Sequence, residues 1–165
     1  MKIHPIIADT GRPSAGIAAN LLNAGWTFTT AIPLPEGGYT LPAQALAVFV
    51  EGTWAELNRP HRMVIELVDD ERQPARFETP TGPQPVRIEQ EITIPSVPTA
   101  PNGTPGLTTA LVDLAQGTIR IDAARRRFIW RVTVSGVTEE VGFWVNPPTV
   151  APRIGGDQGA VPPQV

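Results

Sequence analysis

The side chains of this sequence that could do chemistry are concentrated in one short segment, residues 54–62. The segment places an aromatic ring, a carboxylate, an amide, two guanidinium groups and an imidazole between two apolar stretches. Such a loop on a rigid scaffold could hold a ligand. The candidate binding residues in it are Trp54, Glu56, Asn58, Arg59 and His61.

The same segment has a structural interpretation, which the sequence favours because polar loop residues mostly serve the backbone. Thr53 and Glu56 have the spacing of a capping box, so one helical turn is expected at residues 54–57. Pro60 would end that turn. In this interpretation Glu56 and Asn58 satisfy the amides of the turn.

Two further residue types in the segment fit the structural interpretation. Trp54 would plug one end of the fold with its large apolar ring. Arg59 or Arg62 would pair with a nearby carboxylate.

The sequence gives little support for enzymatic or metal chemistry. The two histidines are His4 and His61, and their spacing to other residues reveals no Ser-His-Asp arrangement. Cysteine is absent, which excludes thiolate nucleophiles and cysteine-based zinc sites. A hydrolase would need a nucleophile beside His61, and it would place Glu56 and His61 at one open pocket. We therefore expect a protein that is not an enzyme and that has no catalytic residues, metal ligands or cofactor.

A run of acidic residues raises the alternative of a calcium site. Residues 69–71 read Asp-Asp-Glu, and Asp9 lies in another predicted loop. Oxygen-rich loops suit hard cations, but this run lacks the fixed ligand spacing of a calcium-binding loop. The sequence favours a polar hairpin turn here.

The clearest structural signal is the segment 127–145, which predicts an antiparallel hairpin. Phe128, Trp130 and Val132 fall on one face of a pleated strand, and polar or charged residues fall on the other. A turn at Ser135-Gly136 then leads into a second aromatic-rich strand. One face of this hairpin is expected to point into a hydrophobic core.

Trp144 adds a sixth candidate binding residue, in the second strand of that hairpin. It is out of phase with Phe143 and Val145, so one of the two faces must be exposed or covered by a loop. An exposed tryptophan would indicate an interface.

Most of the chain repeats the same alternation, and the predicted fold class is all-β. We expect an antiparallel β-sandwich of seven to nine short strands, with a small closed barrel as the alternative. Residues 45–50 are nearly all apolar, as in a central strand covered on both faces. The predicted domain is 1–146. Residues 147–165, rich in proline and glycine, are predicted to form a disordered tail.

The composition limits the kinds of partner that the protein is expected to bind. The chain has 165 residues and a formal net charge of −3, which argues against a general nucleic-acid binder. No apolar run approaches the ~20 residues that would span a bilayer, so no membrane association is expected. Because nothing resembles a signal peptide, the expected location is the cytoplasm.

Several segments together resemble a known family. They are residues 23–26 (Asn-Ala-Gly-Trp), 45–50, 54–62 running into 63–67, and the closing hairpin. The chain resembles a family of uncharacterised β-sandwich proteins of bacteria and their phages, of the actinobacterial type. The resemblance spans roughly residues 3–146. It implies a compact Ig-like or C2-like sandwich without a prosthetic group, and it carries no assigned reaction or ligand.

The functional expectation is a non-enzymatic protein–protein interaction or structural module with an unidentified protein partner. One version of this prediction is a phage or prophage origin, which would make the protein virion-associated. The alternative is a module that binds a small ligand, carbohydrate or calcium, through loops at one end of the sandwich.

Overall fold

The computed structural model describes residues 1–13, 19–77, 81–98, 101, 103–115, 119–121 and 126–148, and this part of the chain is all-β. Its helical content is one 3-10 turn, η1 (Trp54–Glu56). The predicted tail, residues 147–165, lies outside the described residues apart from its first two positions. The predicted fold class is therefore confirmed at the level of an all-β protein.

The described strands are more numerous than expected because several are very short. Nine have four or more residues, which matches the upper end of the predicted range, and six have only two or three. Segments of two or three residues are too short to leave an alternating pattern in the sequence. In chain order the strands are β1 (Lys2–Ala8), β2 (Thr10–Pro13), β3 (Ala19–Leu22), β4 (Phe28–Thr30), β5 (Ile32–Pro33), β6 (Tyr39–Thr40), β7 (Gln44–Gly52), β8 (Pro60–Asp69), β9 (Arg76–Phe77), β10 (Gln84–Pro85), β11 (Arg87–Thr93), β12 (Gly106–Leu114), β13 (Arg120–Ile121), β14 (Arg126–Val134) and β15 (Val137–Asn146).

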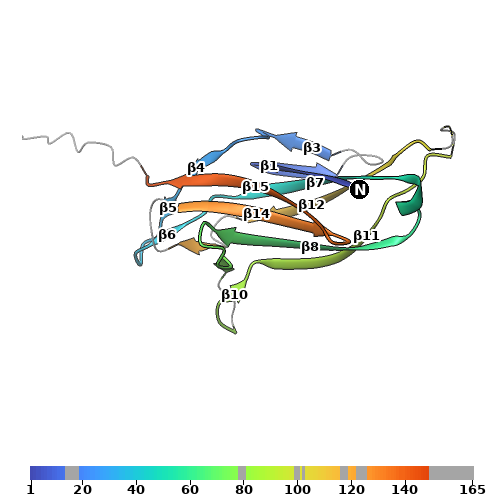
Figure 1. Ribbon diagram of the computed structural model, residues 1–165. Coiled ribbons are helices and arrows are strands. Elements are labelled where there is room, and N and C mark those ends of the chain that lie inside the picture. Colours follow the sequence, from blue (N-terminus) through green and yellow to red (C-terminus); the bar gives the residue numbers. More distant parts are fainter. Residues whose placement is uncertain are drawn as a thin grey trace, which may run out of the picture.

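Two main sheets form the body of the molecule (Figure 1). One has the order β1-β7-β12 and the other has the order β11-β8-β14-β15-β4. Buried apolar residues of both sheets belong to one hydrophobic cluster. Small sheets of β13-β6-β5, β10-β9 and β2-β3 complete the fold, and no described sheet closes on itself. The prediction of purely antiparallel pairing is wrong at one place, because β4 runs parallel to β15.

Strand β7 lies at the centre of its sheet, as its apolar sequence predicts. Its inner residues join the core, and Ala45 and Ala47 on its other face are fully buried as well. The β2–β3 hairpin covers that second face. There a side chain on Gly11 would begin only 2.5 Å from Cδ1 of Leu111. Small residues on this face therefore let the hairpin lie close to the sheet.

The β14–β15 hairpin forms as predicted, and its inner face supplies the largest part of the core. Phe128, Trp130 and Val132 are buried. The indole Nε1 of Trp130 donates a hydrogen bond across the core to Oε1 of Gln44, 3.3 Å away. The turn residue Ser135 has a φ of 47° and the following glycine has a φ of 89°, as a two-residue hairpin turn requires.

The outer face of the five-stranded sheet carries a row of alternating charges. The strand registers place Arg87, Glu66, Arg131 and Glu140 side by side on four neighbouring strands. Arg87 contacts Glu66, and Nε of Arg131 lies 3.1 Å from Oε1 of Glu140. The guanidinium groups of Arg72 and Arg131 lower the pKa of Glu140. Opposite charges on adjacent strands favour this register over a shifted one.

Replacing Trp130 tests whether the two sheets share one core. The Trp130→Ala variant is expected to lose about 3 to 5 kcal/mol of unfolding free energy, because a large cavity remains between the sheets. Urea denaturation followed by circular dichroism measures this loss. The matched control is Trp54→Ala, which removes an exposed indole and should change the free energy by about 0.5 kcal/mol or less. Equal losses in the two variants would contradict a core centred on Trp130.

Candidate functional site

The predicted capping box holds the segment 54–61 in place. The carboxylate of Glu56 accepts hydrogen bonds from the backbone N–H of Thr53 at 2.7 Å and from its hydroxyl at 2.8 Å. The amino group of Met1 lies 3.1 Å from the same oxygen. The hydrogen bonds from Thr53 stabilise the charged form and lower the pKa of Glu56 from 4.5 to about 2. Glu56 therefore serves the turn, as the structural interpretation predicts.

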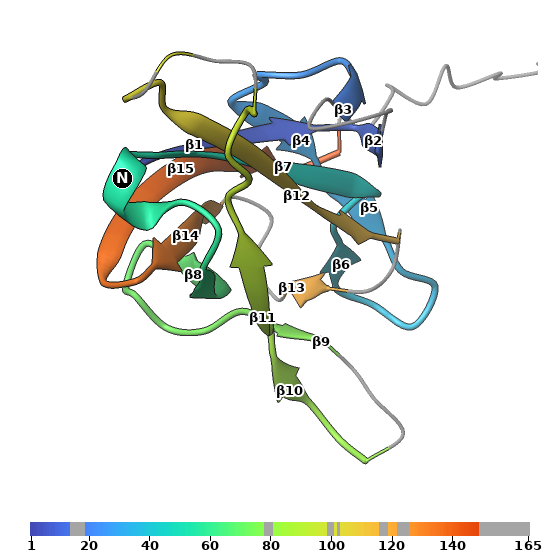
Figure 2. The same cartoon turned by 90° about the vertical axis from the view of Figure 1, so that its right-hand side faces the viewer.

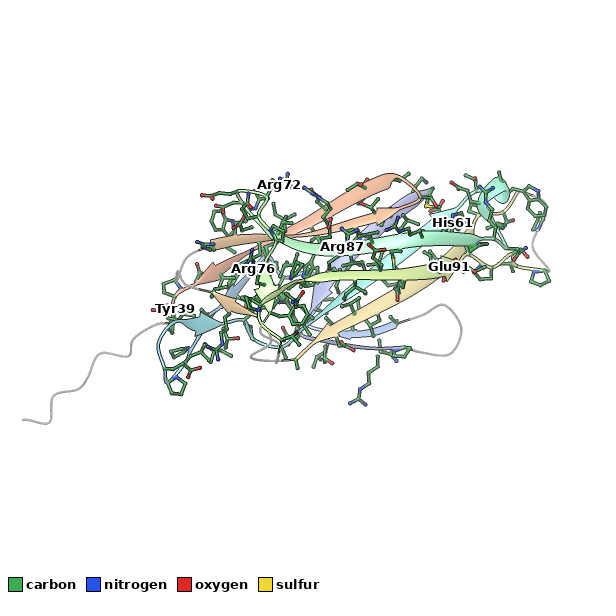
Figure 3. All side chains as sticks on the ribbon, turned by 90° about the horizontal axis from the view of Figure 1, so that it is seen from below. Tyr39, His61, Arg72, Arg76, Arg87 and Glu91 are labelled. Atoms are coloured by element: carbon green, nitrogen blue, oxygen red, sulfur yellow. The ribbon has the colours of Figure 1, made fainter. Side chains whose placement is uncertain are left out.

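His61 connects this turn to the β14–β15 turn. Its side chain is buried, with the residue 4% exposed, and it lies at the end of the molecule that carries η1 (Figure 3). Nε2 lies 2.7 Å from the backbone oxygen of Glu56, and Nδ1 lies 3.0 Å from Oγ of Ser135. Because a carbonyl oxygen can only accept, Nε2 carries a proton and donates it in a hydrogen bond to Glu56.

Asn58 also has a structural role. Its Oδ1 accepts the backbone N–H of Ser96 at 3.1 Å, and its Nδ2 donates to Oγ of the same serine at 3.0 Å. Its backbone N–H donates to the carbonyl of Ile94, and its φ is 53°, a conformation that asparagine tolerates well. Asn58 thus joins the turn after η1 to the segment that follows β11.

The two arginines of the segment differ. Arg62 pairs with Glu89, with Nη2 and Oε2 2.7 Å apart, as predicted for one of them. Arg59 is exposed and has no ion pair with any carboxylate in the described part of the chain. The structure therefore leaves Arg59 at the surface.

The prediction that Trp54 plugs one end of the fold is wrong. Trp54 is 62% exposed. The position between the sheets is taken by Leu57, which packs against the core, and a Cβ on Gly106 would collide with it. The short 3-10 turn thus directs Leu57 inward and leaves the indole of Trp54 in solvent.

The contacts of His61 resemble those of a catalytic base. Its ring lies between a hydroxyl that could be a nucleophile, that of Ser135, and an acceptor that orients the ring, the carbonyl of Glu56. The imidazole is buried, however, and neither His61 nor Ser135 lines any of the cavities described for the molecule. His61 contacts the main chain of Glu56, and the carboxylate of Glu56 binds Thr53, so these two side chains do not converge on any of these three cavities. This geometry supports a role in joining two turns.

The acidic run after β8 forms a turn. Oδ1 of Asp69 accepts the backbone N–H groups of Glu71 at 3.0 Å and Gln73 at 2.8 Å. Within the described residues, no group of three or more histidine, aspartate or glutamate side chains lies close enough together to hold a metal ion.

Trp144 lies far from the other five candidate residues. The start of β15 follows the turn that contacts His61, and Trp144 is seven residues further along the strand, a distance of about 23 Å. Figure 1 shows this end of β15 beside β4, at the opposite end of the molecule from η1. The residues that the sequence groups as one candidate site therefore occupy two places.

Around Trp144 the structure forms a surface that we call the aromatic patch, made of Trp144, Phe28 and Arg127. Trp144 is 45% exposed and Phe28 is 65% exposed. Phe28 is the register partner of Trp144 on β4, and Arg127 is its partner on β14. The guanidinium of Arg127 lies over Gly142, where a Cβ would be only 3.1 Å from Nη2.

The aromatic patch rests on a rigid base. Phe143, which points inward from β15, stacks with Phe128 at 5.9 Å between ring centroids. It also meets Trp26 edge to face at 5.3 Å. These contacts hold the inner face of β15 against the core. The backbone N–H of Trp144 also donates to the carbonyl of Thr27 at 2.8 Å, which ties β15 to the segment before β4. Phe28 is not identifiable as a site residue from the sequence, because only the pairing of β4 with β15 shows that it lies beside Trp144.

Comparison of the chain with protein-family models, with curated proteins and with solved structures found no match. The resemblance to an uncharacterised family of bacteria and their phages stays a prediction. Among the described residues, no helix has the length and apolar character needed to cross a membrane.

The depressed pKa of Glu56 predicts how the turn responds to acid. Its charged form contributes stability that is fully present above pH 4.5 and is lost as the pH falls toward 2. At pH 7 the free energy of unfolding of the Glu56→Gln variant should be roughly 1 kcal/mol lower than that of the native chain. Chemical denaturation at several pH values should show this difference shrinking below pH 4.5.

The control for this experiment is Glu139→Gln. Glu139 is exposed and forms no ion pair with a described residue, so its replacement should change the free energy little at any pH. A Glu56→Gln difference that stayed constant down to pH 2 would contradict the assigned role of the carboxylate.

Proposed function

We propose that the protein is a non-enzymatic interaction module that binds a protein partner through the aromatic patch of Phe28, Trp144 and Arg127. The observation that carries the proposal is the exposure of two large aromatic side chains at register positions on adjacent strands. Single exposed apolar residues are common on protein surfaces, but adjacent ones mark sites of interaction.

The residue types of the aromatic patch support a protein partner. Tryptophan and arginine are the residues most enriched among those that dominate binding energy, and aromatic residues are enriched at interfaces in general. An aromatic side chain has few rotatable bonds, so burying it in a complex costs little conformational entropy. Two of the three side chains project from long strands that are paired on both sides, which holds the patch in a fixed geometry.

The other end of the molecule gives less support for a binding site. There Glu56, Asn58 and His61 are satisfied by Thr53, Ser96 and Ser135, so their polar groups are committed within the fold. Of the five candidate residues in that segment, Trp54, Asn58 and Arg59 are exposed, and among the described residues no side-chain hydrogen bond or ion pair positions Trp54 or Arg59. The alternative, a small ligand such as carbohydrate or calcium held by these loops, is therefore the weaker proposal.

The proposal also includes the fold that carries the aromatic patch. We infer an Ig-like or C2-like β-sandwich in which the sheets β1-β7-β12 and β11-β8-β14-β15-β4 are the two layers. One hydrophobic cluster shared by both sheets supports this inference. A phage or prophage origin and a location in a virion belong to the same proposal and rest on the family resemblance. A location in the cytoplasm is also part of it and rests on the lack of a signal-peptide pattern in the sequence.

Affinity capture with the purified chain as bait tests the proposed function. The native chain should retain specific proteins from its host, and a Phe28→Ser/Trp144→Ser double variant should lose them, because the apolar anchors of the interface are gone. Trp54→Ser is the matched control, since it removes an equally exposed indole from the opposite end of the molecule.

Two results would contradict the proposal. The double variant could retain the same proteins as the native chain, or the native chain could stay monomeric and capture nothing above background. Thermal unfolding of each variant, followed by circular dichroism, shows that any loss of capture does not come from loss of the fold.

A further inference from the structure

A cavity of about 360 Å³ lies at the end of the molecule where β8, β9, β13 and β14 meet. Three arginines from three different strands line it, Arg76 of β9, Arg120 of β13 and Arg126 of β14. Figure 2 shows β9 and β13 near each other beside the lower end of β11, and a β-bridge joins Phe77 to Ile119. We call this space the arginine cavity.

The floor of the arginine cavity is apolar and belongs to the core. Phe128 and Ile121 line it, and both are buried residues of the hydrophobic cluster. Ala75, which is also buried, contributes to the same wall. The cavity therefore combines cationic groups at its rim with apolar atoms at its base, which is the usual composition of a site for an organic ligand.

The arginines are only partly neutralised by the described carboxylates. Arg76 has no ion pair with any of them, and Figure 3 shows it away from His61, toward the other end of the molecule. Nη1 of Arg126 reaches Oδ2 of Asp69 only at 3.5 Å, while Oδ1 of that carboxylate is committed to two backbone N–H groups.

The third arginine has an ion pair that a ligand could replace. Nη2 of Arg120 lies 2.9 Å from Oε1 of Glu36, and both side chains are about half exposed. Exposed pairs of this kind contribute little to stability, so the guanidinium can exchange partners at little cost.

We infer that the arginine cavity binds the carboxylate or phosphate group of a small organic anion whose apolar part contacts Phe128 and Ile121. A guanidinium binds either group through two parallel hydrogen bonds, and Arg76 is the one of the three that has no ion pair with a described carboxylate. Among the described lining residues, three guanidinium groups face two carboxylates, Asp69 and Glu71. The inference rests on residues outside the aromatic patch and does not depend on the proposed function.

Titration of the full chain with benzoate and with phenyl phosphate at constant ionic strength tests this inference. The two probes share an aromatic ring and differ in the anion, so their relative affinity shows which group the cavity prefers. In ¹⁵N-resolved NMR spectra, at least one probe should bind saturably, with a Kd in the millimolar range or below, and should shift the signals of Arg76 and Phe128. Inorganic phosphate and acetate, which lack the ring, should bind more weakly than their aromatic counterparts.

Arg76→Gln should weaken binding by about tenfold or more, because it removes a charge-assisted bidentate contact. The matched control is Arg59→Gln, which removes an exposed arginine at the η1 end and should leave the affinity unchanged. Because the side chain of Arg76 is exposed, the variant is expected to fold, and its thermal unfolding midpoint provides the check.

Three results would overturn the inference. Neither probe could bind saturably at millimolar concentration, the shifted signals could lie away from the cavity, or the two arginine variants could weaken binding equally. The last result would indicate a general effect of surface charge and not a site.

Discussion

The structure depends on the burial of one face of β14 between the two main sheets. Phe128, Trp130, Val132 and Val134 follow one another at alternate positions, and all four are buried. β14 occupies the middle of its five-stranded sheet, so its register determines those of β8 and β15 on either side. A shift by one residue would turn these side chains to solvent and bring arginines into the core.

The same constraint separates the two ends of the molecule. The long hairpin carries the Ser135 turn toward η1, where Glu56, Asn58 and His61 are bonded to Thr53, Ser96 and Ser135 and leave few polar groups for a ligand. At the far end the hairpin exposes Trp144 beside Phe28 and begins β14 with Arg126 at the arginine cavity. The exposed aromatic side chains and the arginine cavity thus lie at one end, and both proposals concern that end.

Local patterns in the sequence were sufficient for the long strands and for the capping box. Alternation predicted the inner face of β14. The phase of Trp144 relative to Phe143 and Val145 predicted that one of the two faces of β15 is exposed or covered by a loop, and Trp144 is 45% exposed. Long-range pairing was not predictable: the parallel contact of β4 with β15 brings Phe28 to Trp144 across more than a hundred residues. The arginine cavity draws on strands far apart in the chain, and the exposure of Trp54 depends on which neighbouring residue, here Leu57, the turn points inward. No local pattern carries such information.

Hydrogen exchange of the tryptophan indole N–H groups, followed by NMR, tests the central claim most directly. The N–H of Trp130 is buried and bonded to Gln44 between the sheets, so it should exchange only when the whole molecule unfolds, while the N–H of the exposed Trp54 exchanges at once. Exchange of the Trp130 N–H as fast as that of Trp54 would contradict an interior held between two sheets by the inner face of β14.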